Sequence, residues 1–184
     1  MQEQFDFFQV TLAIPICTIM KIALVGYMGS GKTFTAKALA EKLDLDFLDL
    51  DAEIESQMQR SISEIISEKG ELYFRKKERE TLSRLLKGSN FVLATGGGTP
   101  CYYDNMELLN ANSDTYFLST SVKVLGLRLV KEKATRPLIS HIADENLNEF
   151  VAKHLFERRH FYEQAKHTLQ GPDFVNEILN RYEK

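Results

Sequence analysis

Short apolar runs alternate with longer stretches of helical periodicity along most of the chain. The apolar runs contain β-branched and aromatic residues and predict short strands, separated by segments long enough to form helices. Such alternation is typical of one α/β domain in which helices cover both faces of a parallel sheet. The predicted strands are Lys21–Val25, Asp46–Leu50, Phe91–Ala94, Thr115–Leu118 and His167–Gln170.

The segment before the first predicted strand differs from the rest. Residues 10–20, VTLAIPICTIM, are apolar over about the length of a signal-peptide core. However, Glu3 and Asp6 precede them in place of basic residues, and no small-residue cleavage site follows. The stretch is also too short to span a bilayer. We therefore expect residues 1–19 to be an upstream extension and residues 20–184 to form a single domain.

The amino-acid composition agrees with a single α/β domain and excludes some classes of partner. The chain has 184 residues, 43% hydrophobic and 27% charged, which suits one domain with a buried core. A formal net charge of −3 gives no overall basic surface, so we expect no nucleic-acid partner and no membrane association. Cys17 and Cys101 make neither a disulfide framework nor a metal-ligand spacing, which indicates a reducing compartment, the cytoplasm.

A phosphate-binding motif follows the first predicted strand. Residues 26–33, GYMGSGKT, match G-x-x-x-x-G-K-[ST], and a helix is expected to begin near Lys32. Its glycines let the backbone curl so that N–H groups point at phosphate oxygens. Lys32 can reach the β and γ phosphates, and the Thr33 hydroxyl group can bind Mg²⁺. The alternative is a glycine-rich turn with a surface lysine, which matches this motif rarely by chance. The predicted nucleotide-binding residues of the loop are Gly29, Ser30, Gly31, Lys32 and Thr33.

Two classes of nucleotide-binding protein fit such a loop: a small-molecule kinase, and a GTPase-type switch or other nucleotide-dependent binding module. A switch needs an apolar strand that ends in Asp followed by Gly, together with an N-K-x-D base-reading motif. The third predicted strand instead runs into TGGG, with no acid at its end. The sequence therefore favours a kinase, which predicts an acidic pair near the γ-phosphate and a basic pocket for an anionic acceptor.

Asp49 and Asp51 supply a candidate acidic pair at the end of the second predicted strand. Side chains alternate along a strand, so we expect the two carboxylates to face the same way, at the edge where ligands bind in parallel sheets. One can orient Mg²⁺ and its waters while the other accepts a hydroxyl proton. Alternatively, Asp51 only caps the helix that follows.

The helical segment after Gly70 has an apolar stripe that is interrupted by charge. Arg75 and Arg79 fall on this stripe, so each must either pair within the protein or face a cleft. Glu71 and Glu78 lie within helical pairing distance of Arg75, which leaves internal pairing open as an alternative. The stripe itself is formed by Leu72, Leu82 and Leu86.

Two later segments are candidates for closing the site. Residues 95–100, TGGGTP, lose much backbone entropy on folding, which indicates close approach to a ligand unless they form an ordinary loop. Residues 131–140, KEKATRPLIS, are basic, and Pro137 ends any helix at Arg136. This segment is either a solvated loop or a mobile lid that places an arginine against the phosphates. Cys101 is expected to be a passive small residue, and a later helix offers Arg158 and Arg159 for an anion site.

In this order and spacing, the motifs resemble the shikimate kinase family, within the nucleoside monophosphate kinase-like fold. The resemblance covers Lys21 to the C-terminus and rests on GYMGSGKT, FLDLD, SISEII, GELYFRKKE, TGGG, TRPL and ERRHFYEQA. It implies a P-loop three-layer sandwich around a five-stranded parallel sheet of order 2-3-1-4-5. It also implies a substrate-binding region near residues 52–85, a lid near residues 131–145, and a cytoplasmic monomer.

The same resemblance implies that MgATP phosphorylates the 3-hydroxyl group of shikimate, toward chorismate and the aromatic amino acids. Mg²⁺ is the implied cofactor, and ATP and shikimate are the implied partners. The implied roles are catalysis for Lys32, Asp51 and Arg136, phosphate binding for Arg136, Mg²⁺ binding for Thr33 and Asp49, and shikimate binding for Asp51, Arg75, Gly97, Gly98 and Arg158.

Some features depart from the family pattern, and two other functions stay open. Arg128 lies one position out of the usual spacing, and the adenine contacts near LQGPDF are not assigned. A kinase for a related polyol acid such as gluconate would share the phosphate loop but would not need both Arg75 and Arg158. A catalytically silent nucleotide-binding module is disfavoured by the intact loop, acid pair and lid arginine.

Overall fold

The computed structural model describes residues 19–182, so the expected extension lies almost entirely outside the described residues. Within this range five parallel strands form one sheet of order β2-β3-β1-β4-β5, which confirms the predicted topology. The strands are β1 (Lys21–Val25), β2 (Asp46–Asp49), β3 (Phe91–Ala94), β4 (Asp114–Ser119) and β5 (His167–Gln170).

The second strand is shorter than predicted, and its end shapes the site. The side chain of Asp49 accepts hydrogen bonds from the backbone N–H groups of Asp51 and Ala52, at 3.1 and 3.3 Å. Asp49 therefore caps a helix that begins at Leu50. Strand alternation is therefore the wrong basis for expecting Asp49 and Asp51 to face the same way, since the strand ends at Asp49 and Asp51 belongs to the first turn of that helix.

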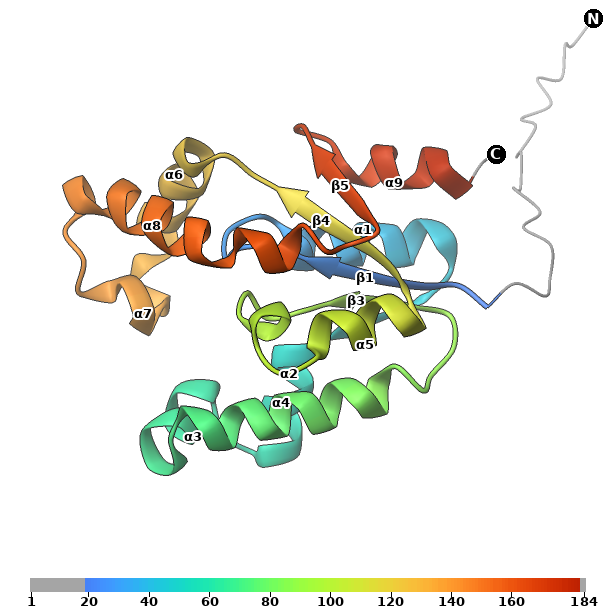
Figure 1. The fold of residues 1–184 in the computed structure, drawn as a ribbon, viewed down its shortest axis with the longest axis horizontal. Helices are drawn as coiled ribbons and strands as arrows, with labels where there is room; N and C mark the ends of the chain where they lie inside the picture. Colours follow the sequence, from blue (N-terminus) through green and yellow to red (C-terminus); the bar gives the residue numbers. More distant parts are fainter. Residues whose placement is uncertain (1–18, 183–184) are drawn as a thin grey trace, which may run out of the picture.

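Helices cover both faces of the sheet, as predicted (Figure 1). The strand arrows point toward the side that carries α6, α7 and α8, while α9 ends at the opposite side. The helices are α1 (Lys32–Leu43), α2 (Leu50–Met58), α3 (Ile62–Lys69), α4 (Glu71–Leu85), α5 (Asn105–Asn112), α6 (Val122–Glu132), α7 (Pro137–Ser140), α8 (Asp144–Tyr162) and α9 (Phe174–Tyr182). Two short 3₁₀ helices, η1 (Thr99–Cys101) and η2 (Lys133–Thr135), lie between them.

The alternation of side chains along β1 creates two hydrophobic cores. Ala23 and Val25 pack into the core under α2, α4, α5, α6 and α8. Ile22 and Leu24 pack on the other face, against α1 and α9. All four side chains are fully buried, which explains why the central strand reads as a continuous apolar run.

The helical segment after β2 is held by local signals in the sequence. Ser61 and Glu64 form a reciprocal capping box at the start of α3, and Gly70 separates α3 from α4 at φ 84°. The predicted apolar stripe on α4 is wrong at Leu72, whose surface is 79% exposed. Its other two leucines are buried, as is Arg75.

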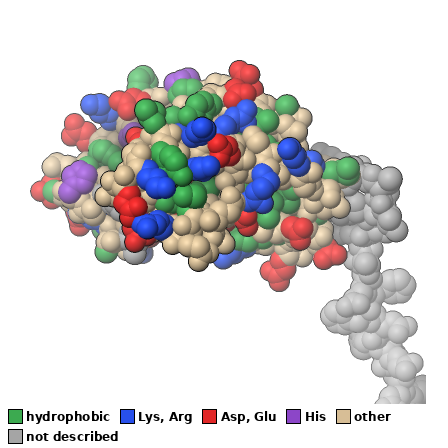
Figure 2. Space-filling model, turned by 90° about the horizontal axis from the view of Figure 1, so that it is seen from below, with side chains coloured by type: hydrophobic (Ala, Val, Ile, Leu, Met, Phe, Trp, Pro, Cys, Tyr) green, Lys and Arg blue, Asp and Glu red, His purple; other side chains and the backbone are tan. Residues whose placement is uncertain are grey.

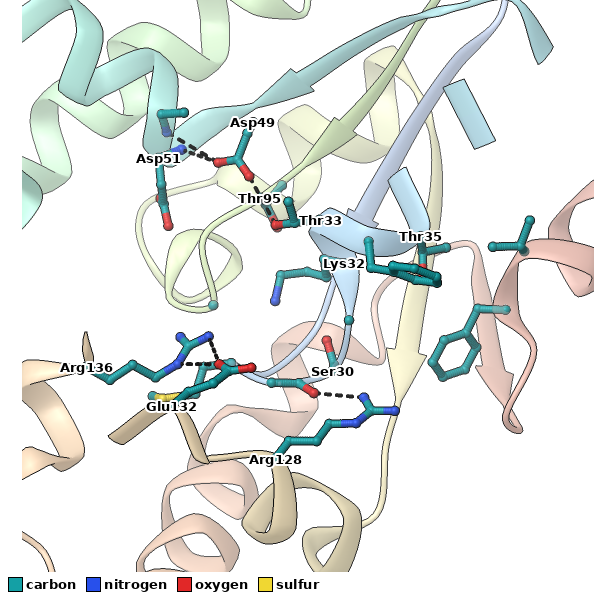
Figure 3. Close-up of a pocket in the computed structure, with 18 of the residues that line it drawn as sticks. Ser30, Lys32, Thr33, Thr35, Asp49, Asp51, Thr95, Arg128, Glu132 and Arg136 are labelled. Carbon is teal, nitrogen blue, oxygen red and sulfur yellow. Dashed lines mark hydrogen bonds and ion pairs between the residues drawn. The ribbon is translucent and has the colours of Figure 1, made fainter. Parts of the chain in front are cut away.

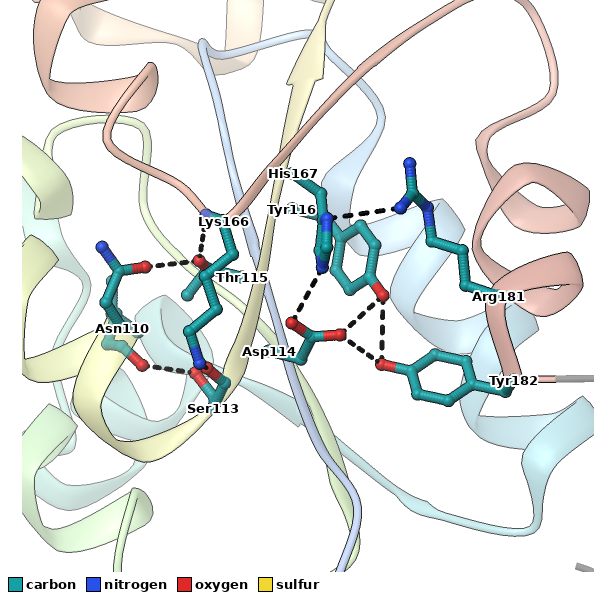
Figure 4. Close-up of polar contacts among 10 residues, drawn as sticks. Asn110, Ser113, Asp114, Thr115, Tyr116, Lys166, His167, Arg181 and Tyr182 are labelled. Carbon is teal, nitrogen blue, oxygen red and sulfur yellow. Dashed lines mark hydrogen bonds and ion pairs between the residues drawn. The ribbon is translucent and has the colours of Figure 1, made fainter. Parts of the chain in front are cut away.

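The edge of the sheet where the strands begin carries a network centred on Asp114, the first residue of β4 (Figure 4). The hydroxyl groups of Tyr116 and Tyr182 donate to Asp114 Oδ2 at 2.7 and 2.9 Å, and Nε2 of His167 lies 3.0 Å from Oδ1. Arg181 contacts the other ring nitrogen of His167. The network therefore fastens β5 and the end of α9 to β4.

The surface beyond α4 carries mixed charge. In the face seen in Figure 2, acidic and basic side chains are interspersed around small groups of hydrophobic side chains. Lys77 pairs with Glu80, and Arg84 pairs with Glu53 on α2.

Across residues 19–182, no helix combines the length and the apolar character needed to cross a membrane.

Candidate active site

The phosphate loop takes the curled form that its glycines predict. Gly29 and Gly31 have φ of 77° and 97°, in the left-handed region that favours glycine. Gly31 is the N-cap of α1, and no side chain caps this helix end within the described structure. Its first N–H groups and its positive dipole end are therefore directed at the cavity, where an anion can bind.

Lys32 extends across the loop that precedes it. Its Nζ atom donates to the carbonyl oxygens of Gly26 and Tyr27, at 2.8 and 3.0 Å. The pKa of Lys32 is lowered to about 8, chiefly by burial and in part by the positive charge of Arg136, against the opposite effect of Asp51. The ammonium group is thus held among weak neutral acceptors, and phosphate oxygens would be stronger partners for it.

Thr33 and Asp49 come together from two elements. The hydroxyl group of Thr33, in the first turn of α1, donates to Asp49 Oδ2 at 3.1 Å (Figure 3). Mg²⁺ is commonly bound by one or two protein oxygens, with waters and substrate phosphates completing its shell. A hydroxyl group and a carboxylate beside a phosphate loop fit that pattern. No group of three or more His, Cys, Asp or Glu residues that could hold a metal ion occurs in the described range.

Asp51 points into the same cavity from the start of α2 (Figure 3). The pKa of Asp51 is raised to about 6, chiefly by burial and in part by the negative charges of Glu78 and Asp49. Lys32 and Arg75 oppose this rise. The charges of the phosphate-loop lysine and of an arginine on α4 thus both act on Asp51, whose pKa is suited to accepting a proton near neutral pH.

The glycine-rich segment after β3 is shaped by two charged neighbours. A Cβ atom added to Gly96 would lie 2.7 Å from Asp51 Oδ1, and one added to Gly98 would lie 2.7 Å from Arg75 Nη2. Gly97 lines the cavity and packs against the backbone N–H group of Met28. Side chains at Gly96 and Gly98 would collide with Asp51 and Arg75, which is a reason within the protein for glycine at these positions. Close approach of the segment to a ligand stays a prediction.

Arg75 is buried in a set of ion pairs. Its Nη1 atom donates to Glu78 Oε2 at 3.0 Å, and its Nε and Nη2 atoms donate to Glu71 Oε1 at 3.3 and 3.1 Å. The ring of Tyr102 covers the guanidinium group at 4.0 Å, and its hydroxyl group donates to Glu71. The internal pairing left open by the sequence is thus present. Arg79 instead pairs with Asp104.

Arg158 faces the same region from α8. Its positive charge acts on Glu71 and on the thiol group of Cys101, as the charge of Arg75 also does. Arg159 instead forms an ion pair with Glu163 at 2.7 Å and borders a second cavity. The structure therefore brings Arg158 toward Arg75. Burial raises the pKa of Cys101 to about 11, consistent with a passive thiol.

Arg136 approaches the phosphate loop from the segment between η2 and α7. It lines the cavity and forms an ion pair with Glu132 on α6, with Nε at 2.9 Å (Figure 3). Arg128, also on α6, donates to the carbonyl oxygen of Gly29 at 2.9 Å, so it supports the loop backbone. The mobility expected for residues 131–145 is not tested by these contacts.

One cavity of about 740 Å³ joins most of these groups. Several of its lining residues were not predicted from the sequence. Thr95 lies between the loops and donates to the carbonyl oxygen of Leu24. The LQGPDF segment, whose contacts could not be assigned, contributes Pro172, Asp173 and Phe174 to one wall. The family resemblance already places adenine contacts near this segment, and the glycine and proline directly after β5 mark the turn from which its lining residues could have been named.

Fold and site together define a P-loop kinase for a small acceptor: a phosphate loop, an acidic residue of raised pKa beside it, and a buried arginine behind that acid. The sequence model of shikimate kinase matches residues 28–182. The shikimate kinase of Flavobacterium psychrophilum is 45% identical over 165 residues, covering 86% of this chain and 96% of that relative. The chain belongs to the shikimate kinase family.

Solved structures agree with this assignment. The shikimate kinase of Bacteroides thetaiotaomicron has a TM-score of 0.81 and 38% identity, covering 89% of this chain and 96% of that chain. The shikimate kinase of Acinetobacter baumannii, solved in complex with shikimate, has a TM-score of 0.81 and 35% identity, covering 89% and 93%. The fold is therefore shared over nearly the full length of both relatives.

Proposed function

We propose that this protein transfers the γ-phosphoryl group of ATP to the 3-hydroxyl group of shikimate, giving shikimate 3-phosphate and ADP, toward chorismate and the aromatic amino acids. The observation that carries the proposal is the position of Asp51, which lines the cavity together with Lys32 and lies against Gly96, two residues from the glycine against which Arg75 lies. A substrate with a hydroxyl group and a carboxylate can reach all three groups: the carboxylate at Arg75, the hydroxyl at Asp51 and the phosphate at Lys32.

On the donor side, the N–H groups of the loop from Gly29 to Thr33 and the ammonium group of Lys32 bind the β and γ phosphates. Arg136 approaches the γ-phosphate from the lid, residues 131–145, and closure of the lid excludes water. Thr33 and Asp49 would hold Mg²⁺. When bound, this ion neutralises charge on the phosphate oxygens.

On the acceptor side, Arg75 and Arg158 bind the shikimate carboxylate, because a planar guanidinium group matches a carboxylate with two parallel hydrogen bonds. Gly97 and Gly98 allow the ring to approach the backbone. The carboxylate must first displace Glu71 from the Nε and Nη2 atoms of Arg75, which the unbound protein keeps paired.

In the transfer step, the substrate oxygen bonds to the γ-phosphorus while the bond from phosphorus to the ADP oxygen breaks. The hydroxyl proton passes to Asp51. Lys32 and Arg136 stabilise the charge on the transferred group, and most of the rate enhancement comes from positioning and charge stabilisation. Asp51 has mainly to aim the hydroxyl group, since a loose transition state needs little help from a base.

A coupled assay of ADP release tests the proposal directly. Purified protein is given MgATP with shikimate or, in parallel, with gluconate, and the phosphorylated product is located by ³¹P and proton NMR. We expect rapid ADP release with MgATP and shikimate but not with MgATP and gluconate, and we expect the product to carry phosphate on the 3-oxygen of shikimate. Turnover of gluconate at a comparable kcat/KM would contradict the assigned acceptor, and absence of turnover with both would favour a silent nucleotide-binding module.

A further inference from the structure

Tyr27, the second residue of the phosphate loop, is a structural support of that loop. Its side chain is 1% exposed. Its carbonyl oxygen accepts hydrogen bonds from Lys32 Nζ at 3.0 Å and from the backbone N–H group of Ser30 at 3.2 Å. The position of Tyr27 therefore decides where the loop places both its lysine and its curled backbone.

The side chain of Tyr27 is fixed by His154 on α8. The Tyr27 hydroxyl group lies 2.8 Å from His154 Nδ1, and the two rings meet edge to face with their centroids 5.5 Å apart. The ring of Phe150 packs near His154 on the same helix, at 5.3 Å between centroids. The contact joins residues that are 127 positions apart in the chain, so it is a tertiary link between α8 and the loop.

The direction of this hydrogen bond follows from the two environments. Burial raises the pKa of Tyr27 to about 12, so its hydroxyl group keeps its proton and donates. Burial lowers the pKa of His154, and Arg158 lowers it further, against the weaker opposite effect of Glu157. The imidazole is therefore neutral at pH 7, and Nδ1 accepts.

The same face of α8 contacts the other loop of the site. His154, Arg158 and Tyr162 follow one another at intervals of four residues, so their side chains share one face of the helix. The Tyr162 hydroxyl group donates to the carbonyl oxygen of Gly97 at 2.6 Å. The helix thus contacts the phosphate loop through His154 and the glycine segment through Tyr162, with Arg158 between them.

We propose that His154 is a positioning residue for the nucleotide: through its hydrogen bond to Tyr27 it holds the phosphate loop in the form that binds the β and γ phosphates. The donor and acceptor sites are then supported separately by α8, the donor site through His154 and the acceptor site through Tyr162 and Arg158. This inference depends on the proposed function only in that the loop binds a nucleotide, and it does not depend on which acceptor is phosphorylated.

The test is His154→Phe, which keeps an aromatic ring against Tyr27 and Phe150 but removes the acceptor nitrogen. We expect the Kd for MgADP, measured by calorimetry without acceptor, and the KM for MgATP to rise about fivefold, as for the loss of one hydrogen bond. The KM for shikimate should stay within about twofold of the wild-type value. His160→Phe is the matched control, because His160 is an exposed histidine of the same helix, and its MgADP affinity should not change.

Two further variants separate positioning from packing. His154→Asn places an oxygen acceptor close to the position of Nδ1 and should recover most of the nucleotide affinity, although it loses more ring contact than the phenylalanine variant. Tyr27→Phe deletes only the hydroxyl oxygen and should weaken MgADP as much as His154→Phe does. The double variant should be no weaker than either single one, because both remove the same interaction.

Unchanged MgADP affinity in a folded His154→Phe protein would overturn the proposal. So would additive losses in the double variant, or equal rises in the KM values of both substrates. If His154→Phe does not fold, Tyr27→Phe alone tests the proposal. Normal MgADP affinity in that variant refutes the positioning role of His154. A wild-type protein that binds MgADP but leaves shikimate unphosphorylated would refute the proposed function while the role of His154 is still measured.

Discussion

Arg75 directs two of its nitrogen atoms, Nε and Nη2, at a single oxygen of Glu71, at 3.3 and 3.1 Å. The third nitrogen, Nη1, donates to Glu78, which is fully buried. The pairing with Glu78 anchors the guanidinium group, whereas Glu71 lies at the half-exposed edge where a substrate carboxylate would bind. One arginine can thus have both the structural and the binding role that the sequence presented as alternatives.

Replacing Arg75 with alanine should separate these roles. We expect the KM for shikimate to rise by the equivalent of about 2 to 3 kcal/mol, because a charge-assisted contact is lost. Thermal stability should fall because the buried carboxylate of Glu78 loses its ion-pair partner and keeps only the hydrogen bond from Thr99. Steady-state kinetics and a thermal melt measure the two effects. Arg79→Ala on the same helix is the control and should leave the KM unchanged. A lower melting temperature with an unchanged KM would mean that Arg75 is only an internal ion-pair partner.

Replacing Glu71 with glutamine should have the opposite effect on substrate binding. A neutral amide competes less well for the guanidinium group than the carboxylate does, so the incoming substrate has a weaker competitor to displace. We expect the KM for shikimate to fall about threefold, with kcat retained. Glu68→Gln, at an exposed ion pair with Arg60, is the matched control. A rise in KM would show that Glu71 positions Arg75 for the substrate and is not displaced.

The buried carboxyl group of Asp51 should make stability depend on pH. Its pKa is raised to about 6 in the folded protein, so its contribution to stability is fully present below the unfolded value of 3.8 and is lost as the pH rises through 6. Without nucleotide or divalent ions, Asp51→Asn should therefore raise the free energy of unfolding at pH 8.5 by about 1 to 2 kcal/mol. At pH 5 the gain should be much smaller. Urea melts at both pH values measure it, and equal effects at the two would refute the assigned pKa.

Asp114→Asn should lower stability without changing catalysis. The asparagine side chain can no longer offer a charged acceptor to Tyr116, Tyr182 and His167, and a loss of about 1 to 3 kcal/mol is expected. The KM values for MgATP and shikimate should stay at wild-type level, because the network lies at the edge of the sheet where the strands begin. A raised KM for MgATP would instead mean that α9 transmits the change to Phe174 at the nucleotide cavity.

Sequence patterns predicted the centre of the sheet well because β1, β3 and β4 are buried on both faces and appear in the sequence as continuous apolar runs. Three of the five predicted strands have the observed bounds, and the strand order follows the family resemblance. The failure at Leu50 has a local cause, since the carboxylate of Asp49 caps the next helix and ends the strand early. The failure at Leu72 arises because the first turn of α4 buries Phe74 in the core. Leu72 is two positions away, so it lies on the opposite, exposed face of the helix.

Sequence analysis named site residues that lie in short motifs of known chemistry. It missed contacts between residues that come from distant segments of the chain. The phosphate loop, Asp51 and Arg136 lie in or beside short motifs, and all of them line one cavity. The partnership of Tyr27 with His154 joins residues 127 positions apart, and no local pattern encodes it. The cover that Tyr102 provides over Arg75 likewise depends on how η1 packs against α4.

The network around Asp114 and the cavity beside Lys32 occupy opposite ends of the same strands. Substitutions at well-separated sites combine additively, so changes at these two ends should show little epistasis. Substitutions in the Asp114 network can therefore change stability during adaptation to a new growth temperature, while selection on turnover acts on the residues of the cavity. The parallel sheet thus separates an end where substitutions tune stability from an end where substitutions change catalysis.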